Sequence, residues 1–370
     1  METAFMHLDH FFSDDSDHAV EQFLAACARR GVKPDCWVHP LRGPAGQELR
    51  THAAWFGPAD ALNLIVLVSG VHGVEAFAGS GAQVALIEQG MLEKEHLPPS
   101  TAVLMIHLIN CWGAAHGRRN TDGNVDLCRN FVDFGEPLPV RPEYEDIHPA
   151  LVCPTLEGPA RDGANQRIER FVAQKGPRAY IQALMGGQYQ HPDGFSYGGN
   201  QPTWSRRVLE EIFTRYTHLA KRVAVIEYHT GLGPWAYGTA VTMHMGNDCQ
   251  RARRWYGNWL DAPNERNLGA SLDGYRVFGH TTEGYKRLTP DAELTAIVLE
   301  FGTYPPEVSL PVMVQDHWLE VYGDPSSDIG ERIRKRMLEL HHPEDRDWRQ
   351  AVLDRANQVF RQALRGLVTA

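Results

Sequence analysis

The chain has 370 residues, of which 43% are hydrophobic and 22% charged, and its formal net charge is −10. This composition is ordinary for a globular protein, and the length is sufficient to bury a large core. The negative charge is not offset by any long block of Lys or Arg, which argues against a nucleic-acid partner.

The sequence also argues against membrane insertion and export. No run approaches the roughly 20 apolar residues that a membrane-spanning helix needs. The first ten residues lack the basic and apolar regions of an export signal. The six cysteines show no Cys-x-x-Cys spacing and are Cys27, Cys36, Cys111, Cys128, Cys153 and Cys249. This spacing indicates reduced thiols, so we expect a cytoplasmic protein.

The first part of the chain is predicted to alternate helices and strands. An amphipathic helix is expected over residues 16–30, followed by a hairpin over 35–57. The hairpin leads into an apolar strand over 64–68, then a helix over 77–86 and a second buried strand over 102–109. A strand that is apolar on both faces is typical of the centre of a parallel sheet covered by helices.

The middle of the chain is richer in polar residues and turns. Residues 113–131 are polar and Gly-rich, which is typical of a functional loop held by rigid strands. Residues 134–165 contain many prolines and acids and are predicted to be an irregular surface excursion. A helix over 165–185 and a Gly/Tyr-rich loop over 186–199 are expected to follow.

The second half returns to strands and helices. Apolar runs predict strands over 223–227, 239–245 and 294–299, with a helix over 248–260, and residues from about 326 to 370 are expected to be helical. Alternating strands and helices predict an α/β fold. We expect one domain over residues 1–370: a three-layer sandwich with a mixed, mostly parallel sheet, helices on both faces and loop insertions over about 134–205.

Polar residues of matching chemistry follow the predicted strands. His72 and Glu75 lie just beyond the first buried strand, and His229 lies just beyond the third. Open α/β sheets bind ligands at the carboxyl ends of their strands. Two imidazoles and one carboxylate match the three protein ligands of a catalytic zinc, which leaves one position open for water.

Charged residues near the same strand ends suggest further roles. Glu300 follows the last predicted strand and could act as general base for a bound water. Arg118, Arg119 and Arg129 lie in the polar loop and could supply positive charge to an oxyanion and to a substrate carboxylate.

Each assignment has a structural alternative. His229 could be a core histidine, Glu300 could cap a turn, and Arg118 and Arg119 could be surface charges. Glu227 shares a strand face with His229, so it could orient that ligand or form an ion pair. Three tyrosines could reach a substrate or simply pack: Tyr197, Tyr228 and Tyr237.

These motifs carry a resemblance to a known group of enzymes. His72-x-x-Glu75, the stretch 126–131 (Asp-Leu-Cys-Arg-Asn-Phe), His229 and Glu300 occur in that order. In this the chain resembles the zinc metallocarboxypeptidase superfamily, which has the carboxypeptidase A-like fold and includes succinylglutamate desuccinylase and aspartoacylase. Five longer phrases, over nearly the whole chain, resemble a bacterial subfamily described as a domain of unknown function: 69–79, 112–131, 187–205, 229–238 and 300–305.

The resemblance implies a set of roles. His72, Glu75 and His229 would hold one Zn²⁺ per chain, and Glu300 would be the general base. Arg119 would stabilise the oxyanion.

The resemblance also bears on substrate binding. Arg118 is the second choice for the oxyanion because the loop length leaves the register open. Arg129 would grip a substrate carboxylate, with Asn130 beside it. Cys128 stands where the superfamily usually has asparagine, and a thiol is a weak hydrogen-bonding partner. Recognition of a free carboxylate is therefore in question.

The expected function is a zinc-dependent hydrolase that cleaves an amide bond in a small peptide or an N-acyl amino acid. The alternative within this class is an esterase or deacylase acting on a substrate without a free carboxylate. The alternative from another class is a non-catalytic carboxylate-binding protein on the same fold. The expected partner is a small-molecule or peptide substrate, and the sequence leaves the oligomeric state open.

Overall fold

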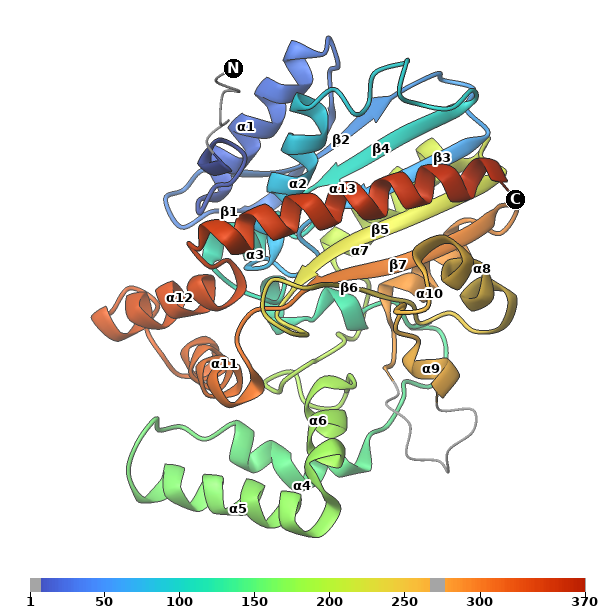
Figure 1. The fold of residues 1–370 in the computed structure, drawn as a ribbon. Coiled ribbons are helices and arrows are strands. Elements are labelled where there is room, and N and C mark those ends of the chain that lie inside the picture. The colour runs from blue at the N-terminus through green and yellow to red at the C-terminus, as the bar shows by residue number, and fades with distance from the viewer. Residues whose placement is uncertain (1–7, 267–276, 370) are drawn as a thin grey trace.

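The computed structural model describes residues 8–266 and 277–369. The expectation that no export signal is present rests mainly on residues 1–7, which lie outside the described residues. A seven-stranded sheet lies at the centre of the fold, between layers of helices (Figure 1). Its strands, in their order across the sheet, are β1 (Asp35–Arg42), β2 (Glu48–Phe56), β4 (Thr101–His107), β3 (Asn63–Val68), β5 (Arg222–Thr230), β7 (Glu293–Phe301) and β6 (Gly238–Val241).

The sheet is parallel at its centre and antiparallel at its edges. β4, β3, β5 and β7 run parallel, whereas β1 pairs with β2, β2 with β4, and β6 with β7 in antiparallel fashion. Parallel strands of this kind are buried on both faces, as the fully buried pattern of β4 shows. The predicted class, a mixed α/β sheet with helices on both faces, is confirmed.

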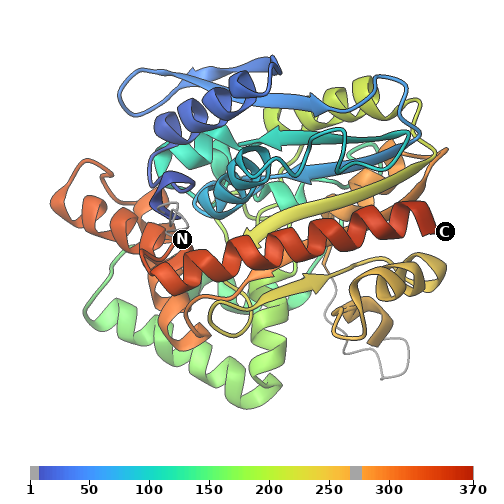
Figure 2. The same ribbon diagram turned by 45° about the horizontal axis from the view of Figure 1, so that its top comes forward.

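One face of the sheet carries the long C-terminal helix. Figure 2 shows it running across this face beside other helices, and Ala224 and Ile226 of β5 pack in the same core cluster. The helices of this face are α1 (Ser16–Arg29), α2 (Ala76–Glu88), α8 (Gly246–Tyr256) and α13 (Arg346–Thr369). α2 is apolar and buried along almost its whole length, as expected for a helix covered on all sides.

The opposite face is covered by α7 (Trp204–Thr217) and α10 (Thr281–Leu288), which share a core cluster with Val223 and Val225 of β5. Because side chains alternate along a strand, odd-numbered residues of β5 point to this face. The same face receives the even-numbered residues of β7, including Leu294.

The remaining helices lie outside the two main layers. In Figure 1, α4 to α6 form a projection below the sheet. All the described helices outside the two main layers, short 3₁₀ turns (η) included, are η1 (Leu8–His10), α3 (Cys111–His116), η2 (Asp122–Asn124), η3 (Leu127–Arg129), α4 (Pro142–Leu151), α5 (Pro159–Lys175), α6 (Pro177–Met185), α9 (Pro263–Arg266), α11 (Pro306–Val321) and α12 (Asp328–His341).

Prolines account for the main errors in the predicted elements. The prediction that 134–165 is irregular was wrong, because α4 lies within it and α5 begins there. The helix predicted over 165–185 is in fact split between α5 and α6 at Gly176. Each of α4, α5 and α6 has proline in its first turn. Proline is well suited to that position, where its missing N–H costs nothing.

Several other boundaries differ from prediction. α3 extends into the stretch 113–131, where a loop was expected, and helices α7, α10 and α11 were not predicted. β5 and β7 run beyond the predicted 223–227 and 294–299, so His229 and Glu300 lie within strands rather than after them.

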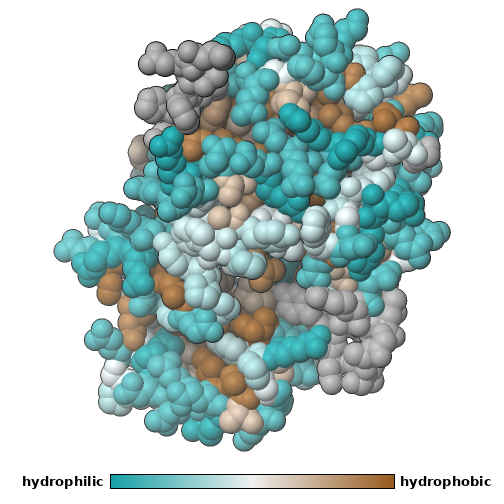
Figure 3. All heavy atoms as spheres, viewed as in Figure 1, coloured by the Kyte–Doolittle hydropathy of each residue, from teal (hydrophilic) through white to brown (hydrophobic). Residues whose placement is uncertain are grey.

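The outer surface is mostly polar in the view of Figure 3, with apolar residues gathered in small separate patches. Across residues 8–266 and 277–369, no helix combines the length and the apolar character that crossing a bilayer demands. The cytoplasmic location and the single-domain organisation stay predictions.

Candidate active site

Three parallel strands bring the predicted residues together. His229 of β5 and Glu300 of β7 are direct partners in the register of the two strands, and Glu227 pairs with Val68 at the end of β3. Glu227, His229 and Glu300 all point to the face covered by α7 and α10, given the alternation of each strand. The chain beyond β3 supplies His72 to the same place.

The turn that carries His72 is built by close backbone contact. A Cβ at Gly73 would meet the backbone carbon of Gly113 at 2.1 Å, so only glycine allows this approach. The backbone N–H groups of Gly73 and Val74 donate to the carbonyls of Arg119 and Arg118, both at 3.1 Å. The turn after β3 and the polar loop are therefore fixed against each other.

Glu75 ends this turn and occupies the N-cap position of α2. The N-terminus of a helix carries partial positive charge, which stabilises a carboxylate there. The side chain is 4% exposed, and the backbone N–H of Thr230 donates to Glu75 Oε2 at 3.2 Å.

His72, Glu75 and His229 form what we call the strand-end cluster. The two Nδ1 atoms are 3.2 Å apart, His72 Nδ1 lies 2.8 Å from Glu75 Oε1, and His229 Nδ1 lies 2.9 Å from Glu75 Oε2. Ligand atoms bound to one tetrahedral zinc at 2.0–2.1 Å are separated by about 3.4 Å. The three donors thus already lie close to the spacing of ligands around one metal ion.

The far nitrogen of each imidazole meets a buried carboxylate. His72 Nε2 lies 3.1 Å from Asp126 Oδ1, and His229 Nε2 lies 2.7 Å from Glu227 Oε1. A carboxylate only accepts, so each Nε2 carries a proton and donates it. In the neutral ring this leaves the lone pair on Nδ1, inside the cluster.

Glu227 is itself held in place from α10. The hydroxyl of Thr281 donates to Glu227 Oε1 at 2.9 Å, and the hydroxyl of Tyr285 donates to Oε2. All three side chains are buried. These bonds fix the carboxylate that orients His229.

The charges of the cluster shift the pKa of every member. Burial lowers the pKa of His229, but its bonds to Glu227 and Glu75 outweigh this and raise it well above the ordinary value. Burial and Arg119 lower the pKa of His72, while Glu75 and Asp126 raise it by more. Burial raises the pKa of Glu75, yet the two histidines hold it well below its usual range. In the protein without metal, the raised pKa values therefore favour the protonated forms of His72 and His229, beside an ionised Glu75.

The two neighbouring arginines have different partners. Arg119 Nη1 donates to Asp126 Oδ2 at 2.7 Å, and its Nε lies 3.6 Å from Glu75 Oε1. Arg118 instead turns towards α11, where it pairs with Asp316 and Glu320, both at 3.2 Å. The structure thus places Arg119 beside the cluster and Arg118 in a contact between the polar loop and α11.

Glu300 stands next to His229 on the neighbouring strand and is only partly exposed. Protein atoms crowd most of its side chain, and this burial raises its pKa to about 7. Glu75 adds to the increase, while His229 opposes it. A carboxyl group with such a pKa can both accept and release a proton near neutral pH.

The stretch 126–131 is largely built into the scaffold. Arg129 donates to the backbone carbonyls of Met185 and Cys128. The Asn130 amide donates to the carbonyls of Gly198 and Gln201 and accepts from a backbone N–H at 203, so its polar atoms are occupied. The predicted substrate contact of Asn130 has no support in these bonds.

Cys128 is also buried, at 3% exposure, and its Sγ lies 3.7 Å from the Thr281 hydroxyl. It therefore packs behind Glu227 rather than at an open surface. Tyr237 is 44% exposed between β5 and β6, with the Arg355 guanidinium over its ring. Its contact with a substrate stays a prediction.

Among the partners of the cluster, the sequence indicated Glu227 but not Asp126, Thr281 or Tyr285. Asp126 belongs to the motif that was singled out, but no role was assigned to it. In the sequence, Asp126 is only an acidic residue in a polar loop, and this position alone does not indicate that it bonds His72. Thr281 and Tyr285 lie more than 50 residues from Glu227 along the chain, so no local pattern connects them.

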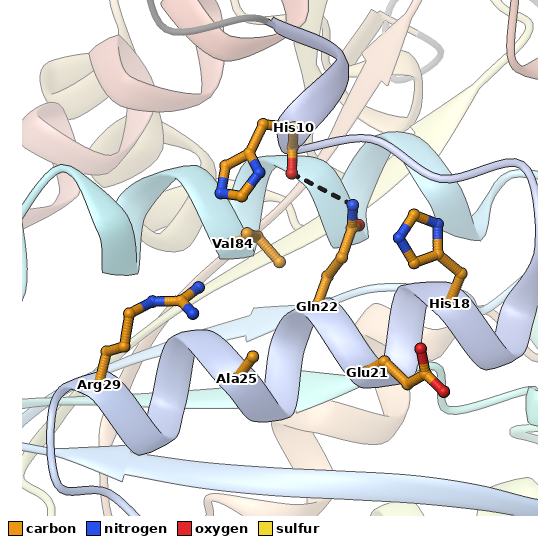
Figure 4. Close-up of a pocket in the computed structure, with 7 residues that line it drawn as sticks. All are labelled: His10, His18, Glu21, Gln22, Ala25, Arg29 and Val84. Atoms are coloured by element: carbon orange, nitrogen blue, oxygen red, sulfur yellow. Dashed lines mark hydrogen bonds between the residues drawn. The ribbon is translucent and has the colours of Figure 1, made fainter.

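A separate surface pocket lies away from these residues. Figure 4 shows it between α1 and α2, with a volume of about 230 Å³. Its lining contains none of the predicted site residues and consists of His10, His18, Glu21, Gln22, Ala25, Arg29 and Val84.

Several solved structures align with most of this chain. Carboxypeptidase A from Helicoverpa armigera is 11% identical, with 90% of this chain and 74% of that chain covered and a TM-score of 0.44. The bovine thrombin-activatable fibrinolysis inhibitor is 10% identical (89% and 99% covered, TM-score 0.45). The murein-tripeptide amidase of Escherichia coli O157 is 15% identical (86% and 97% covered, TM-score 0.32). Likenesses at this level carry no argument about activity.

The comparison with curated proteins gave no match. The family model described as "Protein of unknown function (DUF2817)" matches residues 12–355, nearly the whole chain. This agrees with the resemblance of the longer sequence phrases to a subfamily described only by its unknown function. The chain therefore belongs to the DUF2817 family.

Proposed function

We propose that this protein is a zinc-dependent hydrolase that cleaves an amide bond in a small peptide or an N-acyl amino acid. One observation carries the proposal. The Nδ1 atoms of His72 and His229 and the carboxylate of Glu75 converge, while both Nε2 atoms are held by buried carboxylates.

The donor set of the strand-end cluster suits zinc. Two neutral imidazoles and one carboxylate give nitrogen and oxygen ligands, as in catalytic zinc sites with three protein ligands. The outer carboxylates keep both rings in the required tautomer and make them better ligands. With one negative ligand, a bound Zn²⁺ would keep net positive charge. When bound, the metal would lower the pKa of a water molecule and polarise the substrate carbonyl.

In this proposal Glu300 moves the proton. Its position across from His229 supports that role: it would take a proton from the attacking water and pass it to the leaving amine. The raised pKa, about 7 without metal, reflects burial and the nearby Glu75. Positive charge from a bound metal would lower this pKa and favour the base form.

Arg119 is the better placed arginine for the developing negative charge on the carbonyl oxygen. Its Nε lies 3.6 Å from Glu75 Oε1, whereas Arg118 pairs with Asp316 on α11. Fixed donors of this kind stabilise charge that appears only in the transition state.

The alternative substrate class has one observation in its favour. Arg129, expected to bind a substrate carboxylate, already donates to the carbonyls of Met185 and Cys128. A substrate without a free carboxylate, such as an ester or a blocked acyl compound, would not require those bonds to break.

The test compares zinc-loaded protein on matched substrates: dipeptides, N-acyl amino acids, their C-terminal amides and their esters. We expect hydrolysis of at least one amide bond. Glu300→Gln should retain zinc but lose turnover by about 10²- to 10⁴-fold, because it cannot accept the proton. Glu293→Gln is the matched control, since it lies exposed at the start of the same strand.

The other outcomes are equally informative. Hydrolysis of esters without any amide cleavage would replace the proposal with the esterase alternative. Binding of carboxylates without turnover would favour the non-catalytic carboxylate-binding protein. Wild-type turnover in Glu300→Gln would remove the role of the base. In active protein, kcat/KM should fall as the pH drops below the pKa of Glu300, since a protonated carboxyl group cannot act as a base.

A further inference from the structure

A second group of histidines and carboxylates lies where α4 meets the loop over 186–199. We call it the loop cluster, and it consists of Glu145, His148, His191 and Asp193. His148 Nε2 lies 3.0 Å from Asp193 Oδ1, and His191 Nε2 lies 2.9 Å from Glu145 Oε1. The two imidazole rings stack with centroids 3.8 Å apart. Nitrogen and oxygen atoms of His148, His191 and Asp193 all lie within 4.8 Å of one another.

The loop side of this cluster is rigidly built. The buried amide of Gln188 donates to the carbonyls of His191 and Phe195 and accepts from backbone N–H groups at 190 and 191. Asn124 donates to the carbonyls of Pro192 and Gly194, both at 2.9 Å. These bonds fix the backbone on both sides of His191 and Asp193.

The helix side is docked on the same loop. The buried hydroxyl of Tyr144 in α4 accepts from the backbone N–H of Phe195 at 2.7 Å. Glu145 and His148, three residues apart on α4, therefore face a loop whose position relative to the helix is set. The backbone that carries the four side chains is therefore fixed by bonds other than their own ion pairs.

We propose that the loop cluster is a second divalent-cation site, separate from the strand-end cluster and suited to Zn²⁺. His148, His191 and Asp193 are the ligands, and Glu145 is the fourth ligand or the partner that orients His191. Two imidazole nitrogens with carboxylate oxygens form a donor set that zinc accepts. Two carboxylates also balance the charge of one divalent ion.

The distances within the loop cluster are those of ligand atoms around a metal. Each imidazole Nε2 lies 2.9 or 3.0 Å from a carboxylate oxygen, close to the separation of two ligand atoms on one zinc ion. Exposed ion pairs contribute little stability on their own. The side chains are between 17% and 53% exposed, so an ion could enter from solvent.

The site would link α4 to the loop that supports the strand-end cluster. The Tyr189 hydroxyl donates to the Arg129 carbonyl at 2.7 Å, and the backbone N–H of Asp126 donates to the Tyr197 carbonyl at 2.8 Å. Asp126 in turn bonds His72. A metal in the loop cluster would therefore stiffen the segment that holds an outer partner of the strand-end cluster.

The test uses full-length protein stripped by chelator, then equilibrated with excess ZnCl₂ and dialysed, with zinc counted by elemental analysis. We expect about two zinc ions per wild-type chain and one fewer in His148→Gln/His191→Gln. His218→Gln removes an exposed histidine elsewhere, at the end of α7, and should bind as much zinc as the wild type. His72→Ala/His229→Ala should retain the zinc of the loop cluster.

Hydrogen exchange supplies a second measurement that does not depend on activity. Zinc should slow amide exchange over 186–199 in wild type and in His72→Ala/His229→Ala, but not in the His148→Gln/His191→Gln variant. Equal zinc counts in the wild type and His148→Gln/His191→Gln would overturn the proposal. Unchanged amide exchange over 186–199 when zinc is added to the wild type would also overturn it. This result does not depend on how well His148→Gln/His191→Gln folds. If the wild type bound zinc at the loop cluster but not at the strand-end cluster, only the proposed catalytic site would be contradicted.

Discussion

The two histidine clusters contain the same side-chain types in very different surroundings. In the strand-end cluster, His72 and His229 are 4% and 3% exposed, and each has a buried carboxylate behind its Nε2. In the loop cluster, His148 and His191 are 17% and 24% exposed and use Nε2 for their ion pairs. The strand-end cluster therefore has the ordered outer partners that a catalytic metal needs, whereas the loop cluster suits a structural ion.

Removing the ligands should separate the two clusters most strongly. His72→Ala and His229→Ala each take one ligand from a three-ligand site, so we expect loss of zinc from that site and of measurable turnover. His148→Gln/His191→Gln should retain turnover within a few-fold. Zinc content and kcat/KM, measured on the same samples, check this. Full activity in His229→Ala would contradict the assignment.

The two arginines offer the next contrast. Arg119→Ala should lower kcat by about 10²- to 10³-fold, the usual effect of removing one donor to the developing oxyanion. Arg118→Ala should change kcat little but destabilise the fold by about 3 kcal/mol, because it leaves the buried Asp316 without its partner. Steady-state kinetics and urea unfolding of both variants distinguish the roles. The reverse pattern would make Arg118 the catalytic arginine.

The carboxylate behind His229 should have a smaller effect. Glu227→Gln retains the shape but removes the charge that orients the ring, so zinc affinity should fall by about 10- to 100-fold. Tyr285→Phe removes only a hydroxyl that donates to Glu227 and should have a weaker effect. Competition with a chromophoric chelator measures both affinities. An unchanged affinity in Glu227→Gln would mean that the buried pair serves folding alone.

Cys128 should give the smallest kinetic change. Because it packs behind Glu227 and touches Thr281, Cys128→Ala should leave kcat/KM nearly unchanged and lower stability by about 1 kcal/mol. Cys128→Asn must fit a larger polar group there and should destabilise more, without tighter binding of carboxylate-ended substrates. If Cys128→Asn instead improved binding of such substrates over their amides, Cys128 would lie closer to the substrate than this packing indicates.

The sequence predicted the centre of the fold better than its periphery. Apolar runs such as 64–68 indicate buried strands. The polar residues near the ends of these strands converge because parallel strands end at one edge of the sheet. The helices α4 to α6 were misjudged because their prolines look like helix breakers and in fact stand in first turns.

The site shows the same division. His72, Glu75, His229 and Glu300 could be grouped from their positions after strands. The different directions of the Arg118 and Arg119 side chains could not be predicted, because they depend on where α11 packs. The bonds of Glu227 to α10 are equally remote in sequence, so only the folded chain reveals that this carboxylate is fixed.

The most direct test of the central claim is zinc-edge anomalous diffraction from crystals of the zinc-loaded wild-type protein. We expect a peak about 2.0–2.2 Å from Nδ1 of His72, Nδ1 of His229 and a carboxylate oxygen of Glu75. Zinc density only at the loop cluster, or none near these three atoms, would contradict the account of the active site.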